Sequence, residues 1–377
     1  MSTRPVDSTL EFKSSQPLTV GVELELQLVN TSDLNLAPDA DDLLRRAAGD
    51  THAGELKPEI TQSMIEINSG VHERYETLLA ELRATRDRLA AHARKMNVAI
   101  AGGGTHPFQK WKDRKIYPTE RFLSVSEKYG FLAKQFTVFG QHIHIGCANA
   151  DDAVYLTHAL TRYVPHFIAL AASSPFYQGV DTAFDSSRLS IVNTFPLSGT
   201  MPFVADWRAF AAYFETMRGF GIVKSMKDFY WDVRPKPEFG TVEIRVLDTP
   251  LTVDRAAQIA AYAQALARWL WADRVDWIKP ELYLVHGYNR FQAARHGFAG
   301  ALVDPATRTA VGIAEDIQNT LRVLAPHAAD LGSAPALEAL SSAVRGEGND
   351  AAWLRRTYAA VTTLPDVVRE QAARWMN

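Results

Sequence analysis

The sequence has a single cysteine, Cys147, among its 377 residues. An internal disulfide is therefore excluded, and a lone thiol is typical of a protein from a reducing compartment. The first residues, Met1–Pro17, lack the apolar core of a secretory signal, and no uninterrupted apolar run reaches the length of a membrane span. These absences predict a cytoplasmic protein that has no membrane partner.

An excess of charge of one sign is also lacking. The 40 Lys and Arg residues nearly balance the 43 Asp and Glu residues, so the net charge of -3 gives no reason to expect a nucleic-acid partner. No repeat or low-complexity linker divides the chain. We therefore expect one domain over residues 1–377, with residues 1–16 as a flexible N-terminal arm, and leave a homodimer open.

What the sequence does contain is charge inside strand-like apolar patterns. In Val20–Leu28, Glu23 and Glu25 alternate with valine and leucine, so in a strand both carboxylates share one face while the apolar side chains fill the other. An exposed sheet face with two solvated acids would give the same pattern. If that face is buried, each ionised carboxylate costs several kcal/mol unless it is paired or binds a metal ion.

Three further segments repeat this feature. Their ionisable residues are Glu59 and Glu66 in Glu59–Asn68, His142 and His144 in Gly140–Gly146, and Glu243 and Arg245 in Thr241–Leu247. Glu59 and Glu66 differ by an odd number of positions, so a turn or bulge around Thr61–Ser63 is needed to bring them together. Packed or solvated histidines and a plain Glu243–Arg245 ion pair are the simpler interpretations. Four such segments nevertheless favour a site for Mg²⁺, with the imidazoles favouring tolerance of Mn²⁺.

The order of the periodic segments indicates an α+β fold. Two-faced alternation favours an antiparallel sheet with one functional face over a parallel sheet. Strand-like patterns end near residue 250, and the C-terminal half is expected to be helical. The expected helices are Glu73–Lys95, Ala153–Ala172, Thr252–Asp273, Thr309–Ala325 and Pro365–Met376.

Two loops and a basic run are further candidates for function. Ala101–Phe108, AGGGTHPF, either lets a ligand approach three glycines or forms a tight turn, and the lack of a following GK[ST] disfavours a P-loop. Ser173–Pro202 is long for a structureless connection, which favours a functional loop. Its polar residues include Asp181, Asp185, Arg188 and Asn193. The basic run of Lys110, Lys112, Arg114 and Lys115 is either solvated or touches a phosphate.

Six strings in this order carry a family resemblance: GVELELQL, EITQSMIEINSGV, GGGTHPF, KQFTVFGQHIHIG, SSPFYQGVDTAFDSSR and WDVRPKPEFGTVEIRV. The chain resembles the bacterial carboxylate-amine ligases described as glutamate-cysteine ligase type 2, from about Leu18 to beyond Arg295. That family belongs with the glutamate-cysteine ligases and glutamine synthetases. The resemblance implies a curved antiparallel sheet, packed by helices, that forms a funnel for ATP and divalent metals.

The resemblance also implies roles for individual residues. The implied metal ligands are Glu23, Glu25, Glu59, Glu66, His142 and Glu243, with His144 a second choice beside His142. Glu243 and Arg245 would be catalytic, with Arg245 facing the transferring phosphate. Arg234 would lie on the nucleotide side, and Arg188 would anchor a substrate carboxylate. The roles of Asn289 and Arg295, in YNRFQAARHG, are left open.

The activity implied by the resemblance is ATP-dependent amide formation. A carboxylate becomes reactive once the γ-phosphate of ATP is transferred to it, and an amine then displaces phosphate from the acyl phosphate. The implied substrates are a small-molecule acid and amine, with weak joining of L-glutamate to L-cysteine as the specific expectation. A phosphotransferase acting on a guanidino or amine group, and a catalytically silent protein that binds metal and nucleotide, are the alternatives.

Overall fold

The computed structural model describes residues 10–50, 54–275 and 278–376. At its centre is a seven-stranded sheet whose paired strands run antiparallel, in the order β10-β11-β5-β1-β3-β2, with β4 also paired to β1. The strands are β1 Val20–Asn30, β2 Glu55–Pro58, β3 Met64–Asn68, β4 Val98–Ala101, β5 Gly140–Gly146, β10 Val233–Lys236 and β11 Thr241–Asp248. The expected α+β fold around an antiparallel sheet is confirmed, and the parallel alternative is excluded.

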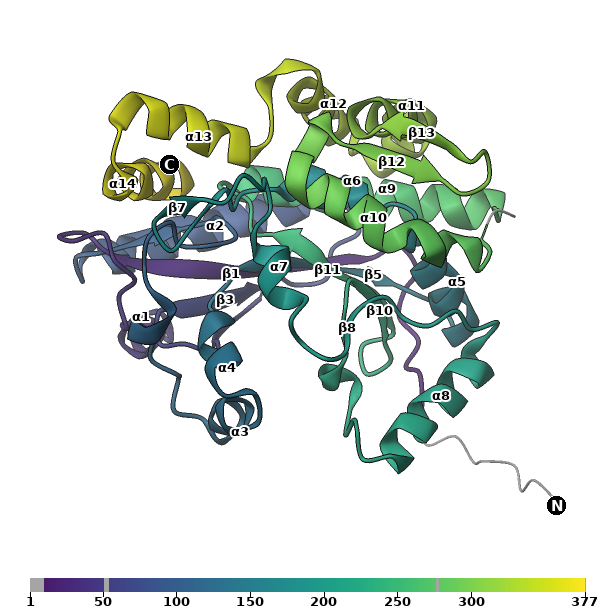
Figure 1. Ribbon diagram of the computed structural model, residues 1–377, viewed down its shortest axis with the longest axis horizontal. Helices are drawn as coiled ribbons and strands as arrows, with labels where there is room; N and C mark the ends of the chain where they lie inside the picture. The colour runs from purple at the N-terminus through teal and green to yellow at the C-terminus, as the bar shows by residue number, and fades with distance from the viewer. Residues whose placement is uncertain (1–9, 51–53, 276–277, 377) are drawn as a thin grey trace.

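Helices cover one face of this sheet, with α2, α5, α6 and α9 in contact with its strands (Figure 1). The helices are α1 Ala40–Ala47, α2 Tyr75–Arg94, α3 Glu120–Tyr129, α4 Phe131–Gln135, α5 Ala150–Thr161, α6 Val164–Ala171, α7 Arg188–Val192, α8 Trp207–Gly219, α9 Val253–Asp273, α10 Glu281–His296, α11 Ile313–Leu331, α12 Ala334–Ser342, α13 Asp350–Val361 and α14 Leu364–Met376. Within the described residues, no helix combines the length and apolar character needed to cross a membrane.

The central strand β1 divides its two faces by chemistry. Val20, Val22 and Leu24 are buried in the main core, whereas Glu23 and Glu25 alternate with them and point to the other face. The alanine-rich helix α9 packs on β1 and β5 from the apolar side, because small side chains let a helix approach a sheet closely. The predicted alternation is therefore confirmed, and the acidic face lies opposite the helical layer.

Shorter elements border the acidic face. The helices α3 and α4 lie on one side of it, and α8 with the 3-10 turn η2 (Met226–Asp228) lies on the other (Figure 1). Lys128 Nζ of α3 lies 3.9 Å from Asp228 Oδ1 of η2, so a long ion pair joins the two borders. The carboxylates of the sheet thus form the floor of a cavity between two walls.

One expected helix is interrupted. Ala153–Ala172 is divided into α5 and α6, with a break after Thr161. Pro165 lies in the first turn of α6, and it has no amide hydrogen to donate to the carbonyl of Thr161. A continuous helix would lose that hydrogen bond, so the chain starts a new helix instead.

The expectation that strands end near residue 250 is wrong. The antiparallel pair β12 (Ala301–Asp304) and β13 (Thr309–Gly312) occupies the start of the expected helix Thr309–Ala325, so α11 begins only at Ile313. The turn between the strands is local in origin, since Asp304 Oδ1 accepts a hydrogen bond from the amide of Ala306 at 2.7 Å. Two further short pairs are β6 Phe176–Tyr177 with β7 Val180–Asp181, and β8 Ser198–Gly199 with β9 Tyr230–Trp231.

Part of the expected N-terminal arm contacts the end of the sheet. Residues 1–9 of that arm lie outside the described residues. The amide of Lys13 donates to Pro237 O at 2.9 Å, and the amide of Ser15 donates to Cys147 O at 2.9 Å. Phe12 packs edge-on against Trp207 with ring centroids 5.4 Å apart. Residues 10–16 are thus held beside the turn between β10 and β11.

Candidate metal and nucleotide site

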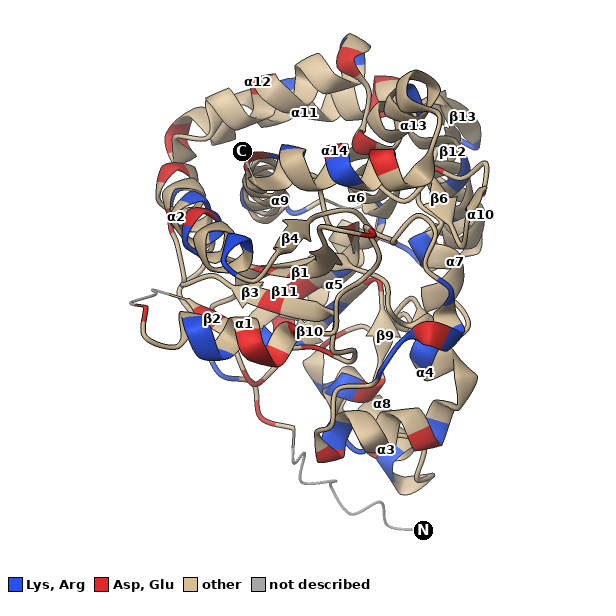
Figure 2. Cartoon of the chain, turned by 90° about the vertical axis from the view of Figure 1, so that its left-hand side faces the viewer, with Lys and Arg blue, Asp and Glu red and all other residues tan. Residues whose placement is uncertain are grey.

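The register of the sheet sets acids and imidazoles side by side. Glu23 of β1 lies directly opposite His142 of β5, and Glu25 lies directly opposite Glu66 of β3. Directly opposed residues of antiparallel strands share one face, with Cβ atoms about 4.5–5.5 Å apart. Two opposed carboxylates repel each other, so the Glu25–Glu66 pair favours a bound cation or a proton between them. Figure 2 shows the acidic positions gathered on the sheet around β1, β3 and β11.

Glu59 joins this face from a turn. It follows β2, and the turn expected around Thr61–Ser63 is present, with the amide of Met64 donating to Thr61 O at 3.1 Å. Glu59 and Glu66 line the same cavity despite their odd spacing. The prediction that a turn brings the two acids together is confirmed.

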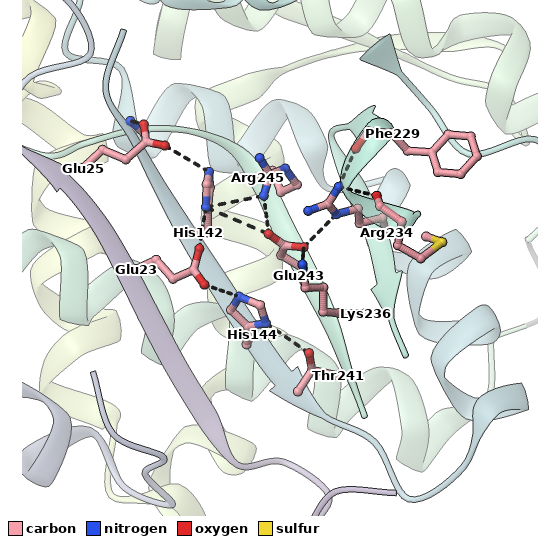
Figure 3. Close-up of polar contacts among 12 residues, drawn as sticks. Glu23, Glu25, His142, His144, Phe229, Arg234, Lys236, Thr241, Glu243 and Arg245 are labelled. Carbon is pink, nitrogen blue, oxygen red and sulfur yellow. Dashed lines mark hydrogen bonds and ion pairs between the residues drawn. The ribbon is translucent and has the colours of Figure 1, made fainter. Parts of the chain in front are cut away.

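A bulge in β11 lies at Arg245 and Val246. Ile244 pairs with Ile143 and Leu247 pairs with Gln141, so two residues of β11 lie opposite the single His142. Such a bulge bends the strand and increases its local twist. Arg245 Nη1 lies 3.5 Å from His142 Nδ1 and donates to Glu243 Oε1 (Figure 3).

Both histidines face Glu23. His142 Nδ1 lies 2.8 Å from Glu23 Oε2, and His144 Nε2 lies 3.3 Å from Glu23 Oε1 (Figure 3). His144 Nδ1 bonds to Thr241 Oγ1 at 3.0 Å, which leaves its Nε2 directed at Glu23. The ligand atoms of Glu23, His144 and Glu243 all lie within 4.8 Å of one another. The geometry thus places His144 as well as His142 for a metal ion.

Three carboxyl groups of the face are not neutralised by the cations around them. Burial raises the pKa of Glu25 to about 7, with repulsion from Glu59 adding to the effect. Burial also raises the pKa of Glu66 well above its ordinary value, again with a contribution from Glu59, and burial raises the pKa of Glu59 itself. Carboxylate oxygens in this state suit a hard divalent cation, which would replace the protons they otherwise hold.

Two other carboxylates are held ionised by the protein. Burial opposes the ionisation of Glu23, but hydrogen bonds with His142 and His144 outweigh burial and lower its pKa. Burial of Glu243 is likewise outweighed by nearby guanidinium groups, chiefly that of Arg234, and its pKa lies well below the ordinary range. Burial, helped by Arg245, lowers the pKa of His142 to about 4, so this imidazole is neutral and keeps a lone pair for a ligand.

These groups line one cavity of about 220 Å³. Its floor is the acidic face, with Glu23, Glu25, Glu66, His142, Glu243 and Arg245. One wall comes from α3, with Arg121 and Phe122, and the other comes from η2 and β9, with Lys227 and Tyr230. The cavity therefore collects all six predicted metal ligands together with Arg245.

Arg188 lies beside this cavity with unused hydrogen-bonding capacity. It is 4% exposed, and its Nε and Nη1 atoms have no hydrogen-bond partner among the described residues. It lines a small adjoining cavity of about 30 Å³ with Glu25, His142 and Arg245. The guanidinium packs over Gly140, where a Cβ atom would lie 2.2 Å from Nη2. Buried guanidinium N–H groups without hydrogen-bond partners cost folding free energy unless an anion accepts their hydrogen bonds.

Arg234 is engaged by the protein itself. Its Nε donates to Glu243 Oε2 at 2.7 Å, and its Nη1 donates to Met226 O at 2.8 Å and to Phe229 O at 2.5 Å. It lines the main cavity. Arg234 therefore orients Glu243 and fixes the η2 turn, whatever else it contacts.

Comparison with known proteins decides the family. The model of the glutamate-cysteine ligase family 2 (GCS2) matches residues 19–374. The chain belongs to glutamate-cysteine ligase family 2. Proteins provisionally named glutamate-cysteine ligase 2 from Herminiimonas arsenicoxydans and Chromobacterium violaceum are each 56% identical to it over 367 residues, covering 97% of this chain and 99% and 97% of their own length.

Two solved structures have a similar fold to this chain. A glutamate-cysteine ligase from Francisella tularensis in complex with AMP aligns over 97% of this chain and 90% of its own, with a TM-score of 0.65 and 12% sequence identity. A bifunctional glutathione synthetase from Pasteurella multocida aligns over 95% of this chain and 52% of its own, with a TM-score of 0.67 and 14% identity. At such identities the likeness concerns the fold alone.

Four cations of the cavity were not singled out by sequence reasoning, namely Lys57, Arg121, Lys227 and Lys236. Lys57 lies directly opposite Glu66 on β2, and Lys236 Nζ on β10 lies 3.9 Å from Glu243 Oε2. Arg121 enters from α3. Lys57 and Lys236 alternate with acidic or basic site residues in their strands and could have been found by that spacing, whereas Arg121 has no local signal.

The glycine-containing loop Ala101–Phe108 packs against other parts of the protein. A Cβ at Gly102 would lie 2.0 Å from Pro250 O, and one at Gly104 would lie 2.5 Å from Asp248 Cγ. The loop and its glycines do not line the main cavity. The glycines therefore let the loop pack closely against residues 248–250 of the protein itself. This favours a tight turn over a loop that binds a ligand.

Other candidates from the sequence also hold the protein together. Asp181 and Asp185 both bind Arg355 of α13. Asn289 pairs with the backbone of Val303, and Arg295 donates to Ala183 O. In the basic run, Arg114 is buried and donates to Lys134 O and Gln135 O at the end of α4, while Lys110, Lys112 and Lys115 are exposed. None of these lines the main cavity, and Asn193 lines a separate hollow beside α10.

Proposed function

We propose that this chain is an ATP-dependent carboxylate-amine ligase that forms an amide through an acyl phosphate. One observation carries the proposal: an acidic, histidine-bearing sheet face lies beside two arginines, Arg245 and the unpartnered Arg188. A carboxylate and a triphosphate repel each other, so an enzyme that joins them needs bound cations and fixed positive charge at the point of contact.

In the first step a carboxylate oxygen of the acid attacks the γ-phosphorus of ATP, and ADP leaves with the electrons of the broken P–O bond. The Nε and Nη1 groups of Arg188 would hold an anionic carboxylate of this substrate, because they have no partner among the described residues. Arg245 would face the phosphoryl group that is transferred, and its hydrogen bond to Glu243 would orient the guanidinium. In the second step the amine nitrogen attacks the acyl carbon, phosphate leaves, and the nitrogen loses a proton.

The residues present fit Mg²⁺, with Mn²⁺ as the alternative. The ligand atoms of Glu23, Glu66 and His142 all lie within 4.8 Å of one another, as do those of the set that contains His144. The residues that would hold the ions are Glu23, Glu25, Glu59, Glu66, His142, His144 and Glu243. When bound, divalent ions neutralise the oxygens of the nucleotide and the acid, so that these can approach in line.

We place the nucleotide at the neighbouring end of the sheet. A hollow of about 510 Å³ there shares Glu23, Lys57 and Phe239 with the acidic cavity. Phe239 is 55% exposed and offers a ring on which a base can stack. Lys57 and Lys236 would then reach the phosphates, and Arg234 would act on the nucleotide side by orienting Glu243.

The names of the relatives support L-glutamate and L-cysteine as substrates, with weak formation of γ-glutamylcysteine. The test incubates the purified protein with ATP, Mg²⁺ and L-glutamate, adds a panel of amines that includes L-cysteine, and measures ADP, phosphate and product mass. We expect ADP and free phosphate in step with a γ-glutamyl amide. A phosphorylated acceptor would instead indicate a phosphotransferase, and no ATP consumption with any acid and amine would indicate a silent binding protein.

We place the reaction in the cytoplasm, a location supported by the lone cysteine of the chain. The mechanism needs no side-chain nucleophile. Cys147 is buried, and burial raises the pKa of its thiol to about 12, so it is suited to packing and not to attack.

A further inference from the structure

The carboxylate of Asp248 is buried, and the mechanism above does not use it. Asp248 ends β11 and is 1% exposed. Its Oδ2 accepts hydrogen bonds from Ser173 N at 3.0 Å and Ser174 Oγ at 2.7 Å, and its Oδ1 accepts one from Ser186 Oγ at 2.8 Å. A buried carboxylate with three converging donors fixes the segments that supply them.

Those segments carry Arg188. Ser174 Oγ, which donates to Asp248, also accepts a hydrogen bond from the amide of Arg188 at 3.1 Å. Ser187 Oγ donates to Ser174 O at 2.6 Å. Since Arg188 is the first residue of α7, the start of this short helix is tied to the end of β11 through Ser174.

The other end of Arg188 meets the same strand pair. Asp248 lies directly opposite Gly140 in the register of β11 and β5, and the guanidinium of Arg188 packs over Gly140. Burial lowers the pKa of Arg188, and the charges of Glu25 and Asp248 oppose that effect. Asp248 therefore acts on Arg188 through its main chain and through the strand on which its side chain rests.

We propose that Asp248 is a positioning residue for the acid substrate, which holds Arg188 at the small cavity that this arginine lines with Glu25. This inference rests on the proposed function for the role of Arg188, while the position of the arginine can be observed without it. Neither Asp248 nor the serines bonded to it line the acidic cavity, so the proposal has them act through Arg188 and not on the substrate.

The experiment compares Asp248→Asn with Asp316→Asn as a matched control. Asp316 is also a mostly buried carboxylate with several donors, from Arg162 and His166, but it lines neither cavity beside the acidic face. Crystal structures of both variants locate the Arg188 guanidinium, and steady-state kinetics give KM for L-glutamate and for ATP. We expect Asp248→Asn to displace the guanidinium from Gly140 and to raise KM for L-glutamate about tenfold, with KM for ATP changed less than twofold.

Asp316→Asn should lower the melting temperature and leave both KM values unchanged. If Asp248→Asn does not fold, Ser174→Ala, which breaks the same connection and removes no charge, should give the same displacement and the same KM split. An unmoved Arg188, or an equal rise in both KM values, would overturn the inference. If the wild-type protein turns over no acid, the proposed function fails, and the position of Arg188 in the variant still decides whether Asp248 holds it.

Discussion

Glu25 of β1 and Glu66 of β3 are direct cross-strand neighbours, two carboxyl groups facing each other on one side of the sheet. Burial raises the pKa of both groups. In the absence of a cation, such a pair favours the protonated state, so the protein without metal is poised to respond to pH.

The contribution of Glu25 to the stability of the metal-free protein should fall as the pH rises from about 4.5 to about 7. His142 acts in the opposite sense over much of this range, because burial lowers its pKa to about 4, so the contribution of Glu25 is measured as the difference between the wild type and Glu25→Gln. In this window the unfolded Glu25 has lost its proton, whereas the folded group keeps it until a pKa of about 7. The stabilising contribution of this group is complete below the unfolded pKa, is lost through the folded pKa, and amounts to about 3 kcal/mol. Calorimetry in EDTA at several pH values measures the trend.

Excess Mg²⁺ should flatten this dependence, because the ions replace the protons on the folded state. Glu25→Gln should flatten it without metal. A pH dependence of the melting temperature in EDTA that is the same in the wild type and in Glu25→Gln would show that these carboxyl groups are not held as described.

Arg245→Ala should lower kcat by about 100-fold or more while the fold is kept, because the phosphoryl group loses its fixed cation. Arg234 remains to pair Glu243. Arg245→Lys should restore only part of the rate, because a point charge cannot replace a guanidinium fork. If Arg245 serves only as an ion pair for Glu243, the alanine variant will instead show a lower melting temperature and ordinary turnover.

Arg188→Ala should raise KM for the acid substrate with a much smaller change in KM for ATP. The reason is that its Nε and Nη1 groups, beside Glu25, have no hydrogen-bond partner within the part of the chain that the structure describes. Kinetics with ATP, acid and amine varied separately make the measurement. A loss confined to ATP would assign Arg188 to the nucleotide, and no change at all would remove it from the site.

Gly140→Ala, a change on β5, should reproduce part of the rise in KM for the acid that we expect in Arg188→Ala. The new Cβ atom would lie 2.2 Å from Arg188 Nη2, so the guanidinium must move. Gly219→Ala is the control, since its Cβ would meet no atom within 4 Å and Gly219 lines none of the cavities described above. We expect KM for the acid to rise several-fold in Gly140→Ala, at a cost of about 1–3 kcal/mol in stability. Equal KM values in the two variants would contradict the packing of Arg188 on Gly140.

Much of the sheet could be predicted because its strands alternate strictly. The buried and cavity-facing positions of β1 follow from Glu23 and Glu25 among apolar neighbours, and β5 has the bounds Gly140–Gly146 that the sequence indicated. The break at Pro165 has a local cause as well. The strand β13 was missed because the alanine-rich pattern that follows it continues the same apolar spacing.

The remainder of the site depends on contacts that are distant in the sequence. The bulge at Arg245 is defined only by pairing with β5, and the packing of Arg188 on Gly140 joins residues from different elements. Arg121 reaches the cavity because α3 borders it, which no spacing within α3 indicates. The family resemblance supplied the roles of Arg188 and Arg234, while the structure adds His144 by its distance from Glu23.

The central claim is that the acidic face holds divalent metal ions for phosphoryl transfer. Its most direct test is anomalous diffraction from crystals soaked with Mn²⁺ and a non-hydrolysable ATP analogue. The account predicts ions about 2.0–2.3 Å from the carboxylate oxygens and imidazole nitrogens of the face. The residues concerned are Glu23, Glu25, Glu59, Glu66, His142, His144 and Glu243. Anomalous peaks elsewhere, or an analogue bound with no ion on this face, would contradict it.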